Sequence, residues 1–329
     1  MLAGMKNHAI GGYFELELLG GSEFHKGKVA LNSGRNALKY ILQRLRPSKL
    51  LLPRYLCEAV MQPVQDLDIS YAFYTINEQL DPVGLDRFDT DNAVLYINYF
   101  GLKDRTVGSL AQSYKNLIID NTQAFFAPTT DAVPAFYSAR KFFGVPDGAY
   151  VGGCATGEDH LEVDRSHERF AHLLKRVELG AEGGFVDYQA NEAAIASLPL
   201  QRMSRLTSRI LSSINYSDVI DRRQKNYKTL HSLLSQHNLA VFADIDDQSV
   251  PMAYPFLCED SSMIREALLR HKIFCAQLWT NVVKDLANEP NSVEYQMAKN
   301  VIPLPVDQRY NEEDMQYVAS VITKVLQNG

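Results

Sequence analysis

The sequence has few cysteines and no long apolar run, and each absence excludes a class of protein. Four cysteines occur among 329 residues, far apart and never in CxxC spacing, which indicates reduced thiols and not a disulfide framework. No apolar run approaches the roughly 20 residues of a membrane-spanning helix. The start of the chain also lacks the basic and apolar regions of a secretory signal. We therefore expect a cytoplasmic protein without a membrane partner.

Basic blocks, metal-ligand patterns and nucleotide loops are missing as well. The net charge is -6 with acids and bases well mixed, so we expect no nucleic-acid partner. The closest histidines, His160, His167 and His172, lack the i, i+4 spacing that places two ligands on one helix face, so no metal site is predicted. Neither a Walker loop nor a GxGxxG pattern occurs, which argues against the common nucleotide-binding loops.

What the chain does contain is an alternation of short β-rich runs with amphipathic helices, which predicts an α/β fold with a parallel sheet. A helix is predicted over 33–45, and strands are predicted at 49–53, 69–74, 93–98, 117–120, 135–138 and 149–152. The later pattern predicts helices at 162–178, 203–236, 262–270 and 312–326, and strands at 240–242 and 252–257. We expect a large domain over residues 1–214 and a small α/β domain over residues 215–329.

One pair of residues in this frame suggests a pyridoxal phosphate (PLP) site. The apolar run 117–119 ends in Asp120, and Lys141 follows 21 residues after that acid. PLP chemistry needs a lysine amine that bonds the cofactor as a Schiff base and a carboxylate that keeps the pyridine nitrogen protonated. Lys141 and Asp120 can supply both. The apolar residues after Lys141 would desolvate its amine and make it a better nucleophile, whereas the alternative is an ordinary surface lysine.

Two further features would suit the phosphate of such a cofactor. The segment 32–38, Asn-Ser-Gly-Arg-Asn-Ala-Leu, opens the first predicted helix with small residues where the free backbone N–H groups point outward. Taken alone, it could equally be an ordinary helix cap. Ser138 precedes Lys141 by three residues, a spacing that allows its hydroxyl to reach the phosphate of a lysine-bound cofactor.

At these residues the chain resembles the DegT/DnrJ/EryC1/StrS family, sugar aminotransferases of PLP fold type I, over almost its full length. The segment 120–124, Asp-Asn-Thr-Gln-Ala, resembles the family's Asp-Ala-Ala-His/Gln-Ala, and 33–38 resembles its Ser-Gly-Thr-Ala-Ala-Leu turn. Residues 141–148 are similar to its lysine loop, and 96–101 to its Pro-Val-His-Leu-Tyr/Phe-Gly segment. The run 202–204, Arg-Met-Ser, resembles a helix start of the family that precedes a basic helix like 222–226.

The resemblance implies a large domain with a mostly parallel seven-stranded sheet and a small C-terminal α/β domain. It places Asp120 on the ring nitrogen and Gln123 near the ring. It assigns the phosphate turn to Ser33, Gly34 and Arg35, and Asn98 to the cofactor site. For the aromatic side chain that stacks on the cofactor, Tyr55 is the candidate, with a core tyrosine as the alternative.

Three departures from the family pattern bear on the site. Arg35 stands where a threonine is usual, and Ala149 where a second glycine is usual. Leu200 and Gln201 replace an Asn-Tyr pair whose asparagine reaches the partner subunit's phosphate in the family. The candidates to take over that phosphate contact are Gln201 or Arg202 from the partner subunit, or Arg35 within the same subunit.

The favoured function is a PLP-dependent aminotransferase that passes an amino group from an amino acid such as glutamate to a nucleotide-linked keto sugar. Surface-polysaccharide synthesis is the pathway that the resemblance suggests. One alternative is a PLP-dependent sugar dehydratase, but dehydratases of the family carry histidine in place of the lysine, and Lys141 counts against it. The other alternative is a catalytically silent PLP-fold binding protein.

We also expect a homodimer with shared active sites. Fold type I enzymes build each site from two subunits, and residues 9–14 form a short apolar segment that needs a packing partner. Residues near Arg202 would approach the phosphate of the other subunit.

Overall fold

The computed structural model describes residues 11–128, 132–154, 160–243, 245 and 248–328. Its centre is a sheet in the order β1-β8-β7-β6-β5-β2-β3-β4. The strands of this sheet are Val29–Leu31 (β1), Lys49–Pro53 (β2), Ser70–Ile76 (β3), Pro82–Val83 (β4), Ala93–Ile97 (β5), Leu117–Asn121 (β6), Ala135–Ser138 (β7) and Ala149–Gly152 (β8).

The middle of the sheet is parallel, as the sequence predicts. β2 runs parallel to β3 and β5, and β6 runs parallel to β5 and β7. β8 is antiparallel to both of its neighbours, β7 and β1. The expected seven strands become eight because the two-residue β4 pairs with the end of β3. Each residue of β5 and β6 is buried, which is typical of strands covered on both faces.

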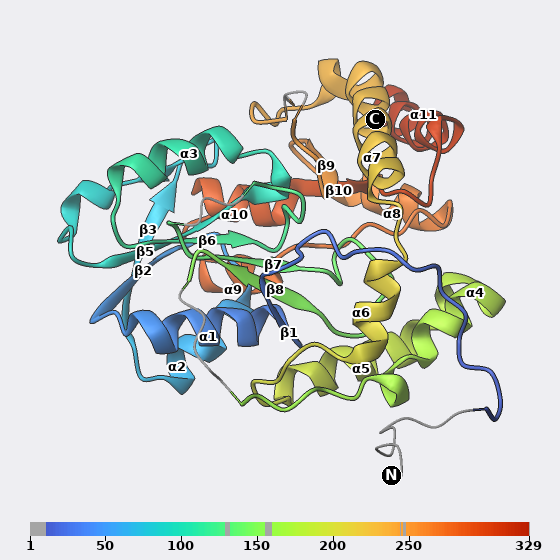
Figure 1. Ribbon diagram of the computed structural model, residues 1–329. Coiled ribbons are helices and arrows are strands. Elements are labelled where there is room, and N and C mark those ends of the chain that lie inside the picture. Colours follow the sequence, from blue (N-terminus) through green and yellow to red (C-terminus); the bar gives the residue numbers. More distant parts are fainter. Residues whose placement is uncertain (1–10, 129–131, 155–159, 244, 246–247, 329) are drawn as a thin grey trace, which may run out of the picture.

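Helices cover both faces of this sheet. α1 and α2 lie on one face and α3 on the other (Figure 1). The helices are Gly34–Leu45 (α1), Met61–Asp66 (α2), Asp104–Ser113 (α3), Ala171–Gly183 (α4), Phe185–Ser197 (α5), Arg205–Ser212 (α6), Tyr216–Leu234 (α7), Ser262–Arg270 (α8), Thr280–Asp285 (α9), Val293–Asn300 (α10) and Glu312–Asn328 (α11). None of these described helices is both long enough and apolar enough to cross a membrane.

α1 shows how the sequence pattern sets the packing. Its apolar stripe is buried against β7 and β8, through Ala37, Leu38, Ile41 and Leu42. Leu45 was expected on the same face but is 41% exposed. The chain leaves the helix at the next residue, Arg46, with φ 44°, so Leu45 lies beyond the last turn that the sheet covers.

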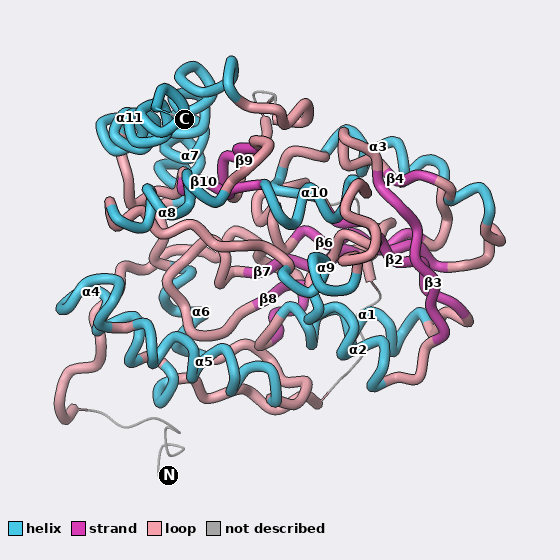
Figure 2. The backbone as a smooth tube through the Cα atoms, turned by 180° about the vertical axis from the view of Figure 1, so that it is seen from behind, coloured by secondary structure: helices cyan, strands magenta, loops and turns pink. Residues whose placement is uncertain are grey.

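The C-terminal part forms a second hydrophobic core around an antiparallel pair of strands, Ala253–Leu257 (β9) and Val301–Pro305 (β10). α7, α8 and α11 gather around this pair (Figure 2). The expected strand at 240–242 is a turn, and the expected helix at 203–236 is broken between α6 and α7. The domain division at residue 214 falls in that break and remains a prediction.

Candidate cofactor site

β6 carries Asp120 to the carboxyl edge of the parallel sheet, where open α/β sheets bind ligands. Asp120 pairs in register with Ile97 of β5 and Phe136 of β7. Its side chain is only 4% exposed, and Oδ1 accepts a hydrogen bond of 2.8 Å from the backbone N–H of Thr122. The acid is therefore fixed in direction at the centre of the edge.

Lys141 reaches the same place from the loop that follows β7. Its Nζ donates a hydrogen bond of 2.9 Å to Thr122 Oγ1. Thr122 thus connects the two predicted residues, with its hydroxyl on the lysine and its N–H on Asp120. Thr122 is not among the predicted site residues, and its only signal in the sequence is its position two residues after the acid that ends the strand.

The surroundings of Lys141 differ from the expectation. Phe142, Phe143 and Val145 are buried, whereas Lys141 itself is exposed. The apolar side chains after the lysine turn into the core and do not enclose its amine. An exposed amine beside a buried acid is accessible to a ligand that enters from solvent.

The electrostatic balance at Asp120 has two parts. Burial raises the pKa of its carboxyl group, while the charge of Lys141 and the hydrogen bonds from Thr122 lower it. Burial has the larger effect, so the pKa remains above the ordinary value. A buried carboxylate of this kind gains further stabilisation from an added cation, such as a protonated ring nitrogen.

The start of α1 lies against the same threonine. Ser33 caps the helix, because its Oγ accepts a hydrogen bond of 3.2 Å from the N–H of Asn36. A Cβ built on Gly34 would lie 3.5 Å from Thr122 Cγ2, which places the first turn of α1 beside the end of β6. The helix N-terminus and the Lys141 amine therefore belong to one site. Arg35 follows, half-buried, near Arg140.

Gln123 is fully buried next to these residues. Its Oε1 accepts a hydrogen bond of 2.7 Å from the N–H of Phe100, a residue with φ 58° that this bond helps to hold. Its Nε2 is buried and has no hydrogen-bond partner among the described residues. An orphaned buried donor at this position fits a ligand that brings an acceptor. Ser138 is buried at the end of β7, three residues before Lys141.

Two other predicted site residues, Tyr55 and Asn98, make contacts within the protein. Tyr55 has no solvent-exposed surface; its ring stacks on Tyr99 at 5.5 Å and packs edge-on against Trp279 at 4.2 Å. Tyr55 therefore lies in the aromatic core of this structure, and its stacking on a cofactor stays a prediction. Asn98 donates to Asp104 and Asn121, and its Oδ1 accepts from the N–H of Lys103. Both polar ends of its amide are therefore engaged at the start of α3, and a part for Asn98 in the cofactor site stays a prediction.

Two of the segments that resemble the family, the lysine loop and the run 202–204, contact each other although they are far apart in the sequence. Asp147, in the lysine loop, accepts hydrogen bonds of 2.8 Å and 2.7 Å from the N–H and the hydroxyl of Ser204, and another from the Thr207 hydroxyl. Ser204 is the N-cap of α6. These hydrogen bonds therefore connect the loop that carries Lys141 to the start of α6, which follows the Arg-Met-Ser run.

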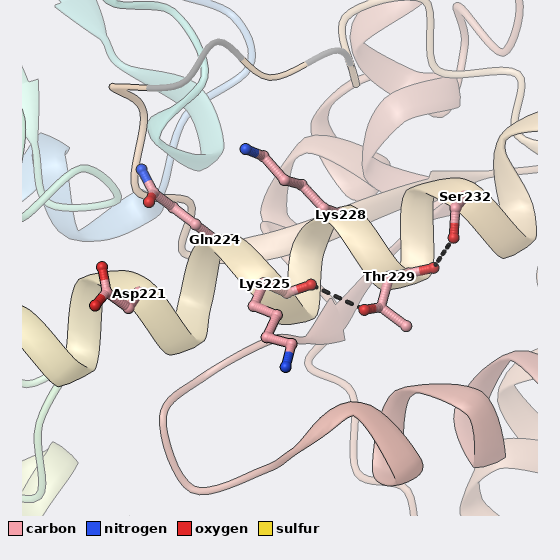
Figure 3. A pocket seen from close by; sticks show the side chains of 6 residues that line it. All are labelled: Asp221, Gln224, Lys225, Lys228, Thr229 and Ser232. Carbon is pink, nitrogen blue, oxygen red and sulfur yellow. Dashed lines mark hydrogen bonds between the residues drawn. The ribbon is translucent and has the colours of Figure 1, made fainter.

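Lys141 is not among the residues that line two recesses of the structure. One, of about 450 Å³, runs along α7 and is lined by Asp221, Gln224, Lys225, Lys228, Thr229 and Ser232 (Figure 3). Its side chains diverge along one helix, and none is a predicted site residue. The other, of about 810 Å³, lies between residues 162–169 and the start of α6. The described residues contain no group of three metal-ligating side chains.

Comparison with known proteins identifies the fold. No family model matches the sequence, and no curated protein matches it. The aminotransferase from Psychrobacter cryohalolentis superposes with a TM-score of 0.62 at 13% identity, over 91% of this chain and 87% of its own. A sugar aminotransferase from Micromonospora echinospora gives 0.57 at 13% identity, over 90% and 86%.

An E. coli GDP-4-keto-6-deoxy-D-mannose-3-dehydratase with bound hydrated PLP superposes with a TM-score of 0.60 at 16% identity, over 90% of this chain and 87% of its own. The chain therefore has the fold of PLP-dependent sugar aminotransferases and dehydratases, fold type I.

Proposed function

We propose that the protein is a PLP-dependent aminotransferase of the DegT/DnrJ/EryC1/StrS family. It would transfer an amino group from an amino acid such as glutamate to a nucleotide-linked keto sugar, in surface-polysaccharide synthesis. The observation that carries this proposal is the hydrogen-bonded set Lys141, Thr122 and Asp120 beside the start of α1. The aminotransferase and the sugar aminotransferase among the proteins of the same fold support it.

The residues of the site fit the cofactor in charge and in chemistry. When bound, PLP supplies an electron sink for the carbon that gains or loses the amino group. The Lys141 amine can bond the cofactor and then accept and return a proton at Nζ. Asp120 holds a positive ring nitrogen, and the start of α1 favours a phosphate group because its N–H groups point outward. The orphaned Gln123 Nε2 can donate to the ring.

Identification of the modified lysine tests the proposal. Borohydride reduction of the PLP-loaded protein, followed by peptide mapping, should place the label on Lys141. The Lys141→Ala variant should fold but lose the visible absorbance of lysine-bound cofactor. Lys115→Ala, which removes an exposed lysine just before β6, should keep that absorbance. Label on another lysine would contradict the assignment.

Glutamate then distinguishes the alternatives. A change in the visible spectrum when glutamate is added supports transamination, because the amino acid must exchange with Lys141. A spectrum that no amino acid alters would instead support the silent binding protein. Loss of water from a keto sugar, without amine incorporation, would support the dehydratase.

We further propose a cytoplasmic homodimer with shared sites. Ala9 and Ile10 of the apolar opening segment lie outside the described residues, but Tyr13 and Phe14 are 99% and 92% exposed within one chain. Burial of these two rings in a two-fold contact would remove a large apolar surface from water. Light scattering at low micromolar concentration should give the mass of a dimer. A PLP-loaded monomer would contradict it.

A further inference from the structure

The basic run 222–226 of α7 contains one arginine that the protein encloses almost completely. Arg223 is only 1% exposed and is among the largest fully buried side chains. Burial lowers the pKa of its guanidinium to about 10, so the group keeps its positive charge at neutral pH. A buried charge is costly unless hydrogen bonds satisfy it. The partners of Arg223 therefore show which parts of the structure this charge connects.

One group of hydrogen bonds from Arg223 reaches the residue after Lys141. Its Nη2 donates a 3.3 Å hydrogen bond to the carbonyl oxygen of Phe142. The same oxygen accepts a 2.7 Å hydrogen bond from Gln308 Nε2, and Arg223 Nε donates to Gln308 Oε1 at 2.9 Å. Arg223 Cζ also lies 4.5 Å from the centre of the Phe142 ring, within the range of a cation–π interaction. Phe142 is therefore held at both its carbonyl group and its ring.

A second group of hydrogen bonds connects Arg223 to Gln123, on the other side of the site. Arg223 Nη1 donates to the carbonyl oxygens of Pro251 and Met252, at 3.1 Å and 3.2 Å. The N–H of Met252 donates a 2.8 Å hydrogen bond to the carbonyl oxygen of Phe100. Phe100 in turn donates its N–H to Gln123 Oε1 at 2.7 Å, and this bond fixes the amide whose Nε2 is orphaned.

The turn Tyr99–Gly101 is in close contact with both of the segments that it connects. Gly101 has φ 74°, and a Cβ built on it would lie 3.0 Å from the carbonyl oxygen of Gln123 and 3.1 Å from that of Val250. Interiors packed this closely transmit small displacements. A shift of residues 250–252 would therefore also shift Gln123.

α7 provides a fixed base for these contacts because it belongs to the C-terminal hydrophobic core. Tyr227 and Leu230 of the helix have no exposed surface and lie in that core. Asn226 Nδ2 donates to the carbonyl oxygens of residues 306, 307 and 310, at 3.2, 3.3 and 3.0 Å. The helix lies with β9, β10 and α11 (Figure 1). An apolar side chain could fill the volume of Arg223, but it could not orient carbonyl groups on two separate segments.

We propose that Arg223 is a positioning residue of the candidate cofactor site. It fixes the Phe142 carbonyl group, and with it the backbone that carries Lys141. It also fixes residues 251–252, and with them the turn that orients the Gln123 amide. This inference rests on the proposed PLP function, and it adds that the C-terminal core sets the position of the lysine amine relative to the Gln123 side chain.

Hydrogen exchange of single backbone amides in the apo-protein tests this inference without the cofactor. The N–H of Phe142 donates to the carbonyl oxygen of Ala139 at 3.0 Å, and the N–H of Phe100 donates to Gln123, so both are protected amides. Arg223→Lys keeps the positive charge, but one amine cannot reach the acceptors on both segments. It should raise the exchange rates of both amides by roughly tenfold, the value of about one hydrogen bond.

A reference amide and a matched control show whether the effect is local. The N–H of Ile119 in β6, which donates to the carbonyl oxygen of Pro134 at 2.8 Å, should exchange at the wild-type rate in Arg223→Lys. Arg222→Gln removes an exposed arginine next to Arg223 and should change none of these amides. An even rise at all of them in Arg223→Lys would overturn the inference, because it would indicate a general loss of stability.

Gln308→Ala separates the two groups of hydrogen bonds. It removes one of the two donors at the Phe142 carbonyl oxygen and leaves the acceptors of Arg223 at residues 251 and 252 in place. The exchange rate of the Phe142 amide should therefore rise, and that of the Phe100 amide should stay unchanged. If Arg223→Lys does not fold, Gln308→Ala decides alone: an unchanged Phe142 amide would overturn the inference.

Steady-state kinetics of the PLP-loaded protein give the consequence for the reaction. Arg223→Lys should lower kcat by about ten- to a hundred-fold, because a small displacement of a reacting group has an effect of that size. The KM for glutamate should change by less than about threefold, since the buried Arg223 cannot touch the amino donor. Raised exchange at both amides with an unchanged kcat would overturn the inference.

The two measurements also separate this inference from the proposed function. If the wild-type protein never bonds PLP at Lys141 but Arg223→Lys raises exchange at both Phe142 and Phe100, the positioning stands and the PLP function fails. If PLP bonds Lys141 in the wild type and Arg223→Lys changes neither the exchange rates nor kcat, the function stands and the inference fails.

Discussion

Two helix starts in this protein are built alike and completed differently. α1 begins after Ser33 and α6 after Ser204, and in each the serine hydroxyl accepts a 3.2 Å hydrogen bond from the N–H three residues on. Each helix also has an arginine in its first turn, Arg35 or Arg205. At α6 the buried carboxylate of Asp147 accepts hydrogen bonds from Ser204 and Thr207. At α1 no acid of the described chain takes that place.

The two helix starts differ in what can occupy the position of an anion. At α6 it is a carboxylate of the chain, and at α1 the position is available to a ligand. A helix start is favourable for negative charge in both cases, because its N–H groups and dipole point outward. At α6 the Asp147 carboxylate occupies this position, and its hydrogen bonds connect the helix to the lysine loop. At α1 the position stays open toward Lys141, with an unpaired Arg35 beside it. The two buried acids differ in the same way. Asp147 has its hydrogen-bond partners within the chain, whereas Asp120 is the proposed partner of a ligand.

The largest effect on stability is expected at the completed helix start. Asp147→Ala would remove the hydrogen-bond acceptor of the buried hydroxyls of Ser204 and Thr207. It should lower the free energy of unfolding by about 3 kcal/mol. Arg35→Ala, at the open start, should change the free energy of unfolding of the apo-protein by less than about 1 kcal/mol. Urea denaturation measures both, and equal costs would contradict the distinction.

A smaller change in the free energy of unfolding, of opposite sign, is expected at Asp120. In the folded apo-protein, burial raises the pKa of Asp120, so the folded state holds its proton more tightly than the unfolded chain. Stability therefore falls as the pH rises from the unfolded pKa through the folded one. Asp120→Asn removes that loss and should raise the free energy of unfolding at neutral pH by about 1 kcal/mol.

The same variant should lower transamination by orders of magnitude, because an amide cannot stabilise a protonated ring nitrogen. Urea denaturation at pH 4 and pH 7 gives the stability change, and an assay with glutamate gives the turnover. Near-normal turnover would remove Asp120 from the site. A variant less stable than the wild type at pH 7 would contradict the pKa argument.

Much of the fold follows from local pattern in the sequence. The ranges predicted for β2, β7, β8 and α8 agree with the structure, because each is a periodic apolar run bounded by polar residues or turns. β10 escaped prediction because Pro303 and Pro305 argue against a strand; proline is tolerated there because β10 has only one neighbour. The turn at 240–242 has strand composition but no partner in register.

The site was only partly predictable, for a different reason. Asp120 and Lys141 stand out because spacing along the chain marks a strand end and a following loop. The Asp147 to Ser204 contact joins residues 57 positions apart, which no local pattern reveals. Side-chain direction is equally hidden: Asn98 also follows a strand, yet its amide is engaged by Asp104 and Lys103.

The smallest expected effect compares the two caps themselves. Ser33→Ala removes one hydrogen bond to a helix N–H and should cost about 1 kcal/mol. Ser204→Ala removes the same kind of bond and also the hydroxyl contacts to Asp147 and Ser166, so its cost should be about twice as large. The midpoint of urea denaturation should shift in that order with an unchanged slope. Equal shifts would mean that the contacts of the Ser204 hydroxyl with Asp147 and Ser166 add nothing to the stability of the α6 cap, and that Asp147 acts there through the Ser204 N–H and the Thr207 hydroxyl.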